Sequence, residues 1–267
     1  VVSEIAKNKT GKKKIVVASI LAALTMTANI VTVEGAIPEG TRTDHLGLAI
    51  GTSSNSKSNQ SVAIGYASSA EAPGANPENP ATAVGAGANA NGAGTVALGL
   101  SANATGTNAV ALGGGSNGGT NKTEATAANT TAIGFNAKAS KSGAAAIGSG
   151  AKASGSDSIS FGTDTVADSE KAIAIGAGSK ATNIGATALG RSSAATAASA
   201  TAVGSLASAT GTTATAVGIE ASASGAESLA IGKTASATSG RALAVGTNAK
   251  ATGASSVAVG SGAGNSG

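Results

Sequence analysis

The stretch TAVGSLASATGTTATAVGIEASASGAESLAIG, residues 201–232, decides the fold because a short tetrapeptide ending in glycine occurs in it three times. The closing glycines are Gly204, Gly218 and Gly232, which gives the repeat a 14-residue period. A fixed period indicates a repeat architecture in which each unit packs on its neighbours. The same glycine, called position 0 below, recurs at residues 51, 65, 85, 99, 113, 134, 148, 162, 176, 190, 204, 218, 232, 246 and 260.

The residues on either side of position 0 predict two short strands per repeat. Position −1 is always Ile, Val, Leu or Phe, and position −2 is Ala except at Ser160. Position −3 is mostly apolar, so apolar side chains alternate as they do in a strand. Small residues recur at positions +3 and +5, as in Ala207 and Ala209, and predict the second strand. After residue 36, 24 of the 33 large apolar residues occupy positions −1 and −3, which a disordered chain would not show.

Stacked coils of this kind predict an all-β parallel roll, or solenoid, of about fifteen rungs. We expect the branched side chains at positions −1 and −3 to face the coil interior, opposite the small groups at +3 and +5. The alanine at position −2 would then point outward. Because an outward methyl group gains nothing in water, we expect this stripe to be covered by another copy of the chain. The candidate interface residues are Ala97, Ala188, Ala202, Ala216 and Ala230.

Composition excludes several classes of protein. The chain of 267 residues has 41% hydrophobic residues, but most of these are Ala, and Val, Ile, Leu and Phe together are only 44 residues, about 16%, which is too little for a conventional layered enzyme core. It has no Cys and one His, so disulfides, thiolate sites and most His-based metal sites are excluded. The net charge of +4 is concentrated before residue 37, and no basic patch with aromatic residues predicts a nucleic-acid partner.

The N-terminal residues predict export. Lys12, Lys13 and Lys14 precede the apolar run Ile15–Leu24, as in a signal peptide, and we assign residues 1–36 to a signal with an extended n-region. Residues 37–45 form an entry segment, and residues 46–267 form the roll. The intervals from Gly65 to Gly85 and from Gly113 to Gly134 exceed the common period. Insertions are therefore expected near residues 66–81 and 114–130, both leaving one region of the coil.

No catalytic, cofactor or metal site is predicted. His45 beside Asp44 is interpreted as a solvated turn, not as part of a catalytic triad. The glycine run of residues 113–119 lacks the Gly-Lys-Ser/Thr ending of a phosphate loop. The acidic residues Asp164, Asp168 and Glu170 are interpreted as a solvated edge.

The repeats resemble those of a known family. Ser61-Val-Ala-Ile-Gly65, Ser228-Leu-Ala-Ile-Gly232 and Ser256-Val-Ala-Val-Gly260 are similar to the head repeats of trimeric autotransporter adhesins, the YadA-like head. The family's adhesive motif is matched here by Ser61, Val62, Ala63, Ile64, Gly65 and Ser68. Residues 1–10 resemble the end of the extended signal region of this family.

The resemblance implies a fold, a function and partners. It implies a left-handed roll, a homotrimer, and display at the bacterial outer membrane for attachment to host cells or matrix proteins such as collagen, fibronectin or laminin, or for autoagglutination. A stalk and a C-terminal membrane anchor, which the family implies, are absent from these residues. The alternatives are a purely structural surface solenoid and ice binding through a Thr array, which the threonines at position −3 suggest.

Overall fold

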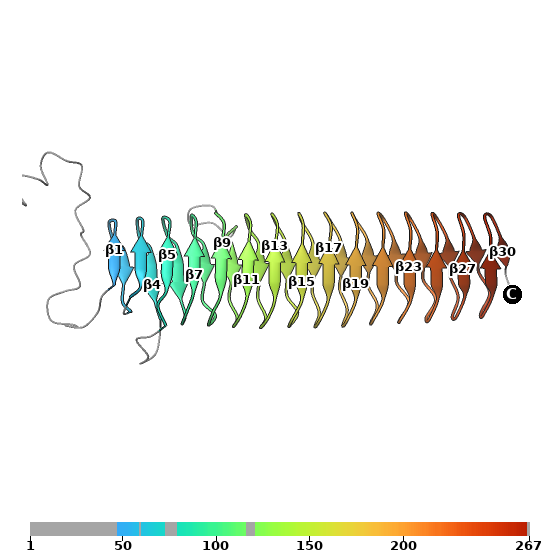
Figure 1. Cartoon of the computed structure of the whole chain (residues 1–267), viewed down its shortest axis with the longest axis horizontal. Coiled ribbons are helices and arrows are strands. Elements are labelled where there is room, and N and C mark those ends of the chain that lie inside the picture. Colours follow the sequence, from blue (N-terminus) through green and yellow to red (C-terminus); the bar gives the residue numbers. More distant parts are fainter. Residues whose placement is uncertain (1–46, 59, 73–78, 116–120, 266–267) are drawn as a thin grey trace, which may run out of the picture.

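The protein is a straight rod of stacked coils (Figure 1). The structure is a computed structural model that describes residues 47–58, 60–72, 79–115 and 121–265. In these ranges the chain forms strands and turns, and each coil contributes one strand to each of two parallel 15-stranded sheets. The prediction of a parallel all-β roll of about fifteen rungs is therefore confirmed.

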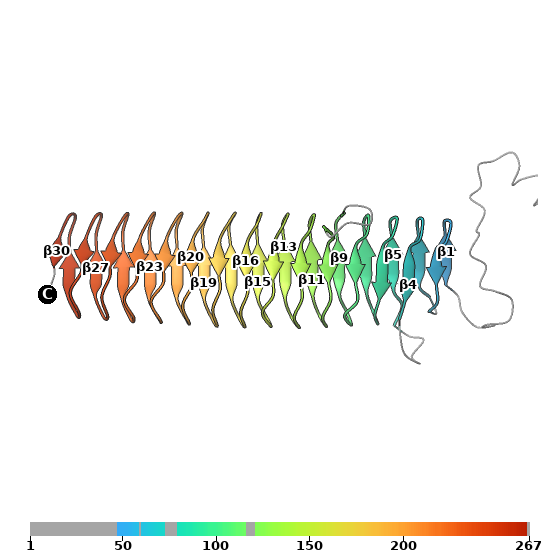
Figure 2. The ribbon, with the colours of Figure 1, turned by 180° about the vertical axis from the view of Figure 1, so that it is seen from behind.

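The two sheets lie face to face, one behind the other in Figures 1 and 2, and both extend along the rod. Sheet A contains the strands that precede position 0, namely β1 (Leu48–Ile50), β3 (Val62–Ile64), β5 (Thr82–Val84), β7 (Val96–Leu98), β9 (Val110–Leu112), β11 (Thr131–Ile133), β13 (Ala145–Ile147), β15 (Ile159–Phe161), β17 (Ile173–Ile175), β19 (Thr187–Leu189), β21 (Thr201–Val203), β23 (Thr215–Val217), β25 (Leu229–Ile231), β27 (Leu243–Val245) and β29 (Val257–Val259). Sheet B contains the strands that follow position 0, namely β2 (Asn55–Ser56), β4 (Ser69–Glu71), β6 (Asn89–Asn91), β8 (Asn103–Ala104), β10 (Glu124–Ala125), β12 (Lys138–Ala139), β14 (Lys152–Ala153), β16 (Val166–Ala167), β18 (Lys180–Ala181), β20 (Ala194–Ala195), β22 (Ser208–Ala209), β24 (Ser222–Ala223), β26 (Ser236–Ala237), β28 (Lys250–Ala251) and β30 (Gly264–Asn265).

Equivalent residues of successive coils lie directly above one another. Ala202 pairs with Ala188 on one side and with Ala216 on the other, so the register follows the repeat period. The backbone N–H of Gly204 donates to the Leu189 carbonyl at 2.7 Å. These hydrogen bonds run along the rod axis, which places each repeat position in a straight column.

The glycine at position 0 is required by the backbone. Gly204 has φ +129°, a conformation that side chains disfavour, and a Cβ at this residue would lie 2.5 Å from the Gly218 carbonyl oxygen. Two further residues per coil are left-handed, at positions +2 and +9, as Leu206 (φ 61°) and Thr213 (φ 56°) illustrate. These two positions accept side chains, whereas position 0 does not.

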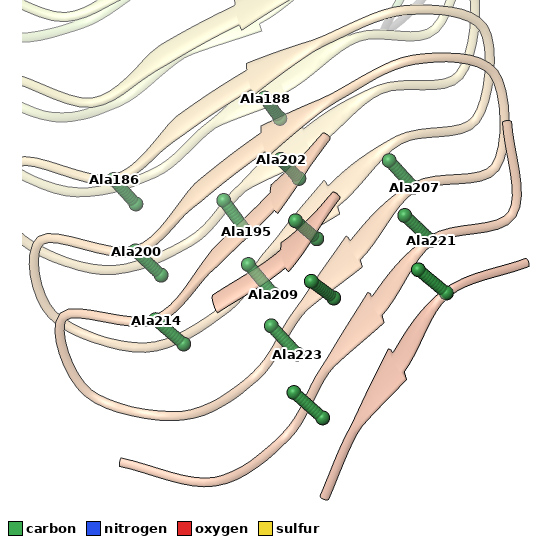
Figure 3. Close-up of a cluster of buried hydrophobic side chains, with 14 of the residues drawn as sticks. Ala186, Ala188, Ala195, Ala200, Ala202, Ala207, Ala209, Ala214, Ala221 and Ala223 are labelled. Atoms are coloured by element: carbon green, nitrogen blue, oxygen red, sulfur yellow. The ribbon is translucent and has the colours of Figure 1, made fainter. Parts of the chain in front are cut away.

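The interior contains only small side chains. Four residues of each coil point inward, at positions −4, −2, +3 and +5, and they are almost all Ala, Ser or Thr (Figure 3). Among the described residues, the largest fully buried side chain is threonine. Several buried hydroxyls donate hydrogen bonds to nearby backbone, as Ser193 does to the Gly190 carbonyl at 2.9 Å, whereas the buried hydroxyls of Ser179, Ser228 and Ser256 have no partner within the described ranges. The two sheets therefore pack through methyl groups.

The predicted direction of the sheet A side chains is wrong. The alanines at position −2 are fully buried inside the coil, so the proposed interface residues Ala97, Ala188, Ala202, Ala216 and Ala230 have no surface to offer a partner. The branched residues at positions −1 and −3 point outward instead, as the half-exposed Phe161 shows. The physical reason is space, because the two closely packed sheets leave room for a methyl group but not for an isobutyl group.

The two insertions leave opposite turns of the coil, which corrects the expectation of a single region. The first lies between β4 and β5, after a sheet B strand. The second lies between β9 and β10, after a sheet A strand. Both β4 and β10 fall inside the predicted insertions, so the extra residues are fewer than the ranges 66–81 and 114–130 suggest.

Removing residues 73–78 should restore the regular repeat spacing without loss of β structure. The deletion brings Pro80 to position +9, where other coils have a left-handed residue such as Asn108 (φ 56°), and the proline ring prevents that conformation. We therefore expect the deletion to be tolerated when combined with Pro80→Asn, measured by far-UV circular dichroism and thermal unfolding. Loss of the β signal in this double variant would contradict the register.

The predicted signal of residues 1–36 and the entry segment of residues 37–45 lie outside the described residues. These assignments stay predictions. Within the described ranges, no helix is long and apolar enough to cross a membrane.

Candidate functional site

The outer face of sheet A is an uncharged and mainly apolar surface. It consists of positions −3 and −1 of every coil, and none of these residues is charged. Many are well exposed, among them Leu98 (47%), Phe161 (51%) and Val259 (65%). Monomeric soluble proteins rarely expose apolar patches of this extent, so the surface indicates an interaction.

The size of this face matches a stable protein interface. Fifteen strands at a spacing of about 4.8 Å and a width of three residues give a surface of about 70 by 10 Å. The product, roughly 700 Å², is close to the about 800 Å² that each partner contributes to a standard interface. The face is therefore large enough to hold another copy of the chain along its whole length.

The outer face of sheet B is polar and suited to solvent. Its residues occupy positions +4 and +6, where hydroxyl, amide and charged groups predominate. Ion pairs join successive coils, with Lys138 3.3 Å from Glu124 and Lys152 2.9 Å from Asp168. Asn89 also donates to the Asn103 side chain at 2.8 Å. The two sheets thus present opposite surfaces, one apolar and one hydrophilic.

The residues that match the adhesive motif divide into a buried and an exposed set. Ser61, Ala63 and Ser68 are fully buried, and the Ser68 hydroxyl donates to the Gly65 carbonyl at 3.0 Å. Val62 and Ile64 lie on the sheet A face, so the expectation that they point into the coil is wrong. Only these two side chains of the motif can contribute to an apolar contact at the surface.

The threonines at position −3 do not form a two-column array. They lie on the sheet A face, and three successive ones, Thr187, Thr201 and Thr215, stand beside Leu189, Val203 and Val217. A column of threonine hydroxyls therefore lies next to a column of branched aliphatic side chains. This arrangement gives no support to ice binding through these residues.

Two of the acidic residues expected to form a solvated edge make exposed ion pairs. Asp168 pairs with Lys152, and Glu170 lies 3.0 Å from the Lys171 ammonium. The hydrogen bond from Lys171 to Glu170 and the charge of that carboxylate raise the pKa of Lys171. In the described part of the chain, no group of three or more metal-ligating side chains comes together. Asp44, His45 and residues 116–119 lie outside the described ranges.

A comparison with protein families agrees with the repeat pattern. The family model "YadA head domain repeat (2 copies)" matches residues 46–75, 80–102, 90–116, 125–151, 153–179, 181–207, 209–235 and 237–263. Among solved structures, the crystal structure of the collagen-binding domain of the Yersinia adhesin YadA is similar at 22% identity. That match covers 74% of this chain and 80% of the other, with a TM-score of 0.24.

No curated protein matches the chain significantly. The family matches extend over most of residues 46–263, and their boundaries follow the coils of the roll. The chain therefore belongs to the YadA head family of trimeric autotransporter adhesins.

Proposed function

We propose that three copies of this chain pack their sheet A faces around a common axis and present a polar adhesive rod at the bacterial surface. The observation that carries the proposal is the uncharged apolar face of sheet A, which extends from β1 to β29. Burial of apolar surface stabilises association at about 25 cal/mol per Å² before the costs of association are subtracted. The polar sheet B faces then point outward.

Adhesion is the function that this arrangement supports best. The outward surface repeats with every coil and on every copy, so many weak contacts can combine into a tight attachment. The ligands proposed are host matrix proteins such as collagen, fibronectin or laminin, or an equivalent head on another cell. Export through the predicted signal and anchoring in the outer membrane belong to the same proposal. No step of it requires a catalytic group or a cofactor.

The trimer is tested by charging each face in turn. Val203→Glu combined with Val217→Glu places two carboxylates on the sheet A face, where burial of an unpaired charge would cost several kcal/mol. We expect light scattering to fall from three copies to one, with unchanged circular dichroism. The matched control, Thr210→Glu with Ser224→Glu, charges the sheet B face and should leave three copies. Equal dissociation of both variants, or a single-copy mass of the unchanged chain, would refute the proposed interface.

The adhesive role is tested on the same proteins. Binding to immobilised collagen, fibronectin and laminin should weaken by about 100-fold or more in the single-copy variant, because the contacts no longer act together. The sheet B control should remain a trimer, so any change in its binding reports contact with the ligand. Absence of binding by the unchanged trimer to all three proteins and to other trimers would contradict the adhesive function.

A further inference from the structure

This inference rests on the proposed trimer and concerns the alignment of its chains along the rod. Because successive coils are nearly identical, two parallel rods can shift by one coil, about 4.8 Å, and still oppose similar side chains. Such a shift would lose the contacts of only one coil out of fifteen. A repeat surface of this kind needs a distinctive feature if one alignment is to be preferred.

The distinctive feature lies at β13 and β15. Position −1 holds branched aliphatic residues in fourteen coils, and Phe161 is its one aromatic residue. Position −3 holds a residue larger than alanine in fourteen coils, and Ala145 is its one alanine. The two strands pair directly, with Ala145 opposite Ile159 and Ile147 opposite Phe161. The largest and the smallest side chains of the sheet A face therefore lie in neighbouring coils.

The interior of the coil that contains β15 also differs from that of the other coils. Ser160 is the one polar residue at position −2, and its hydroxyl lies 2.7 Å from the Thr165 hydroxyl across the roll. Thr165 in turn donates to the Gly162 carbonyl at 3.0 Å. Elsewhere the interior contact between the sheets is made mainly by methyl groups, whereas here a side-chain hydrogen bond joins them. This bond links β15, the strand that carries Phe161, to the residue that precedes β16.

We propose that Phe161 of one copy occupies the space beside Ala145 of the next copy and thereby fixes the axial register of the trimer. In a three-fold ring, the sheet A face of each chain contacts one neighbouring chain along one edge and the other neighbouring chain along the opposite edge. The side chains at position −1 of one chain therefore contact those at position −3 of the next. The contact is repeated three times. A shift by one coil would press Phe161 against a larger side chain and leave a void beside Ala145, and both changes oppose association.

The register is measured by disulfide formation between chains, because the natural chain has no cysteine. One chain carries Leu189→Cys, and a second, differently tagged chain carries Ile173→Cys, Thr187→Cys or Thr201→Cys. A disulfide requires a Cα separation of about 4.4–6.8 Å. Leu189 and Ile173 have the same one-coil offset as Phe161 and Ala145. The pair of Leu189→Cys with Ile173→Cys should therefore dominate in otherwise unchanged trimers, and dominance of either other pair would contradict the proposed contact. The distribution of crosslinked products after mild oxidation reports the alignment.

Phe161→Ile should broaden this distribution. The fraction of the dominant product should fall about twofold, and products one coil away should appear, because the shifted alignments become comparable in free energy. Ala145→Val, which fills the space, should act in the same direction. The matched control Ile175→Leu changes the same column by a residue already common in it and should leave the distribution unchanged.

Moving the phenylalanine and the alanine together to the preceding coils should restore a single register. Phe161→Ile, Ile147→Phe, Ala145→Thr and Thr131→Ala together move the aromatic residue and the small residue by one coil toward the N-terminus. We expect one dominant crosslink again in this variant. If Phe161→Ile and Ala145→Val leave the trimer intact and its crosslinks unchanged, the register inference is overturned and the trimer is not. If the unchanged chain has a single-copy mass and forms no crosslinks, the trimer is overturned as well.

Discussion

Ala202→Glu should unfold the coils around β21. Ala202 is fully buried, with Ala188 and Ala216 above and below it and the methyl groups of sheet B facing it (Figure 3). A glutamate there would exceed the available space and would place a carboxylate in an interior where, among the described residues, no Lys or Arg side chain is buried. We expect a loss of more than about 4 kcal/mol in the free energy of unfolding, measured by thermal and denaturant unfolding.

Two variants serve as controls for this prediction. Thr210→Glu places the same side chain on the exposed sheet B face and should change the free energy of unfolding by no more than about 0.5 kcal/mol. Ala202→Ser introduces a serine at position −2, as β15 has in Ser160, but without the threonine that bonds to Ser160. The unpaired hydroxyl should lower the free energy of unfolding by about 1–3 kcal/mol. Similar stability of the two Glu variants would show that position −2 is not interior.

Gly204→Ala should be nearly as damaging, although it adds a single methyl group. The added Cβ would meet the carbonyl oxygen of Gly218 at 2.5 Å, and φ +129° is unfavourable for any residue with a side chain. Since the stack fixes both coils, neither can move without breaking ladder hydrogen bonds. We expect a loss of about 3 kcal/mol or more in stability, with protection from hydrogen exchange reduced first in β19, β21 and β23.

Gly178→Ala is the matched control. Gly178 has φ +70° and lies at position +2, where Ser192 and Leu206 adopt similar left-handed angles. Its added Cβ would approach no atom closer than 3.4 Å. The cost should be about 1 kcal/mol. An equal loss in both variants would mean that backbone strain, and not the contact with the next coil, decides the requirement for glycine.

The period and the strands could be predicted from the sequence because both depend on local patterns. Alternation at positions −3, −2 and −1 identifies a strand with two unlike faces, and recurrence of this pattern at a fixed period identifies stacked coils. The glycine at position 0 marks the turn. Two-sheet packing follows from the second set of small residues at positions +3 and +5.

The direction of the faces could not be obtained from hydrophobicity alone. Apolar residues usually point inward, but a two-sheet coil as short as this one has an interior that accepts only Ala, Ser and Thr. A signal was available in the variability of each column. Position −3 tolerates Leu, Val, Ile, Thr and Ala, as an outer surface does, whereas position −2 varies between Ala and one Ser. Hydrophobicity alone therefore assigns the outer surface to the alanines at position −2, whereas the structure places the large apolar residues of positions −1 and −3 there.

The direction of the backbone hydrogen bonds has a mechanical consequence. They run along the rod, so a force that pulls the two ends apart loads the coils one after another and not all together. Each coil that detaches would release one whole repeat of chain, which extends to about 45 Å in place of the about 4.8 Å that the coil occupied. A single chain under tension would thus lengthen stepwise, and each step would dissipate work before the next coil is loaded.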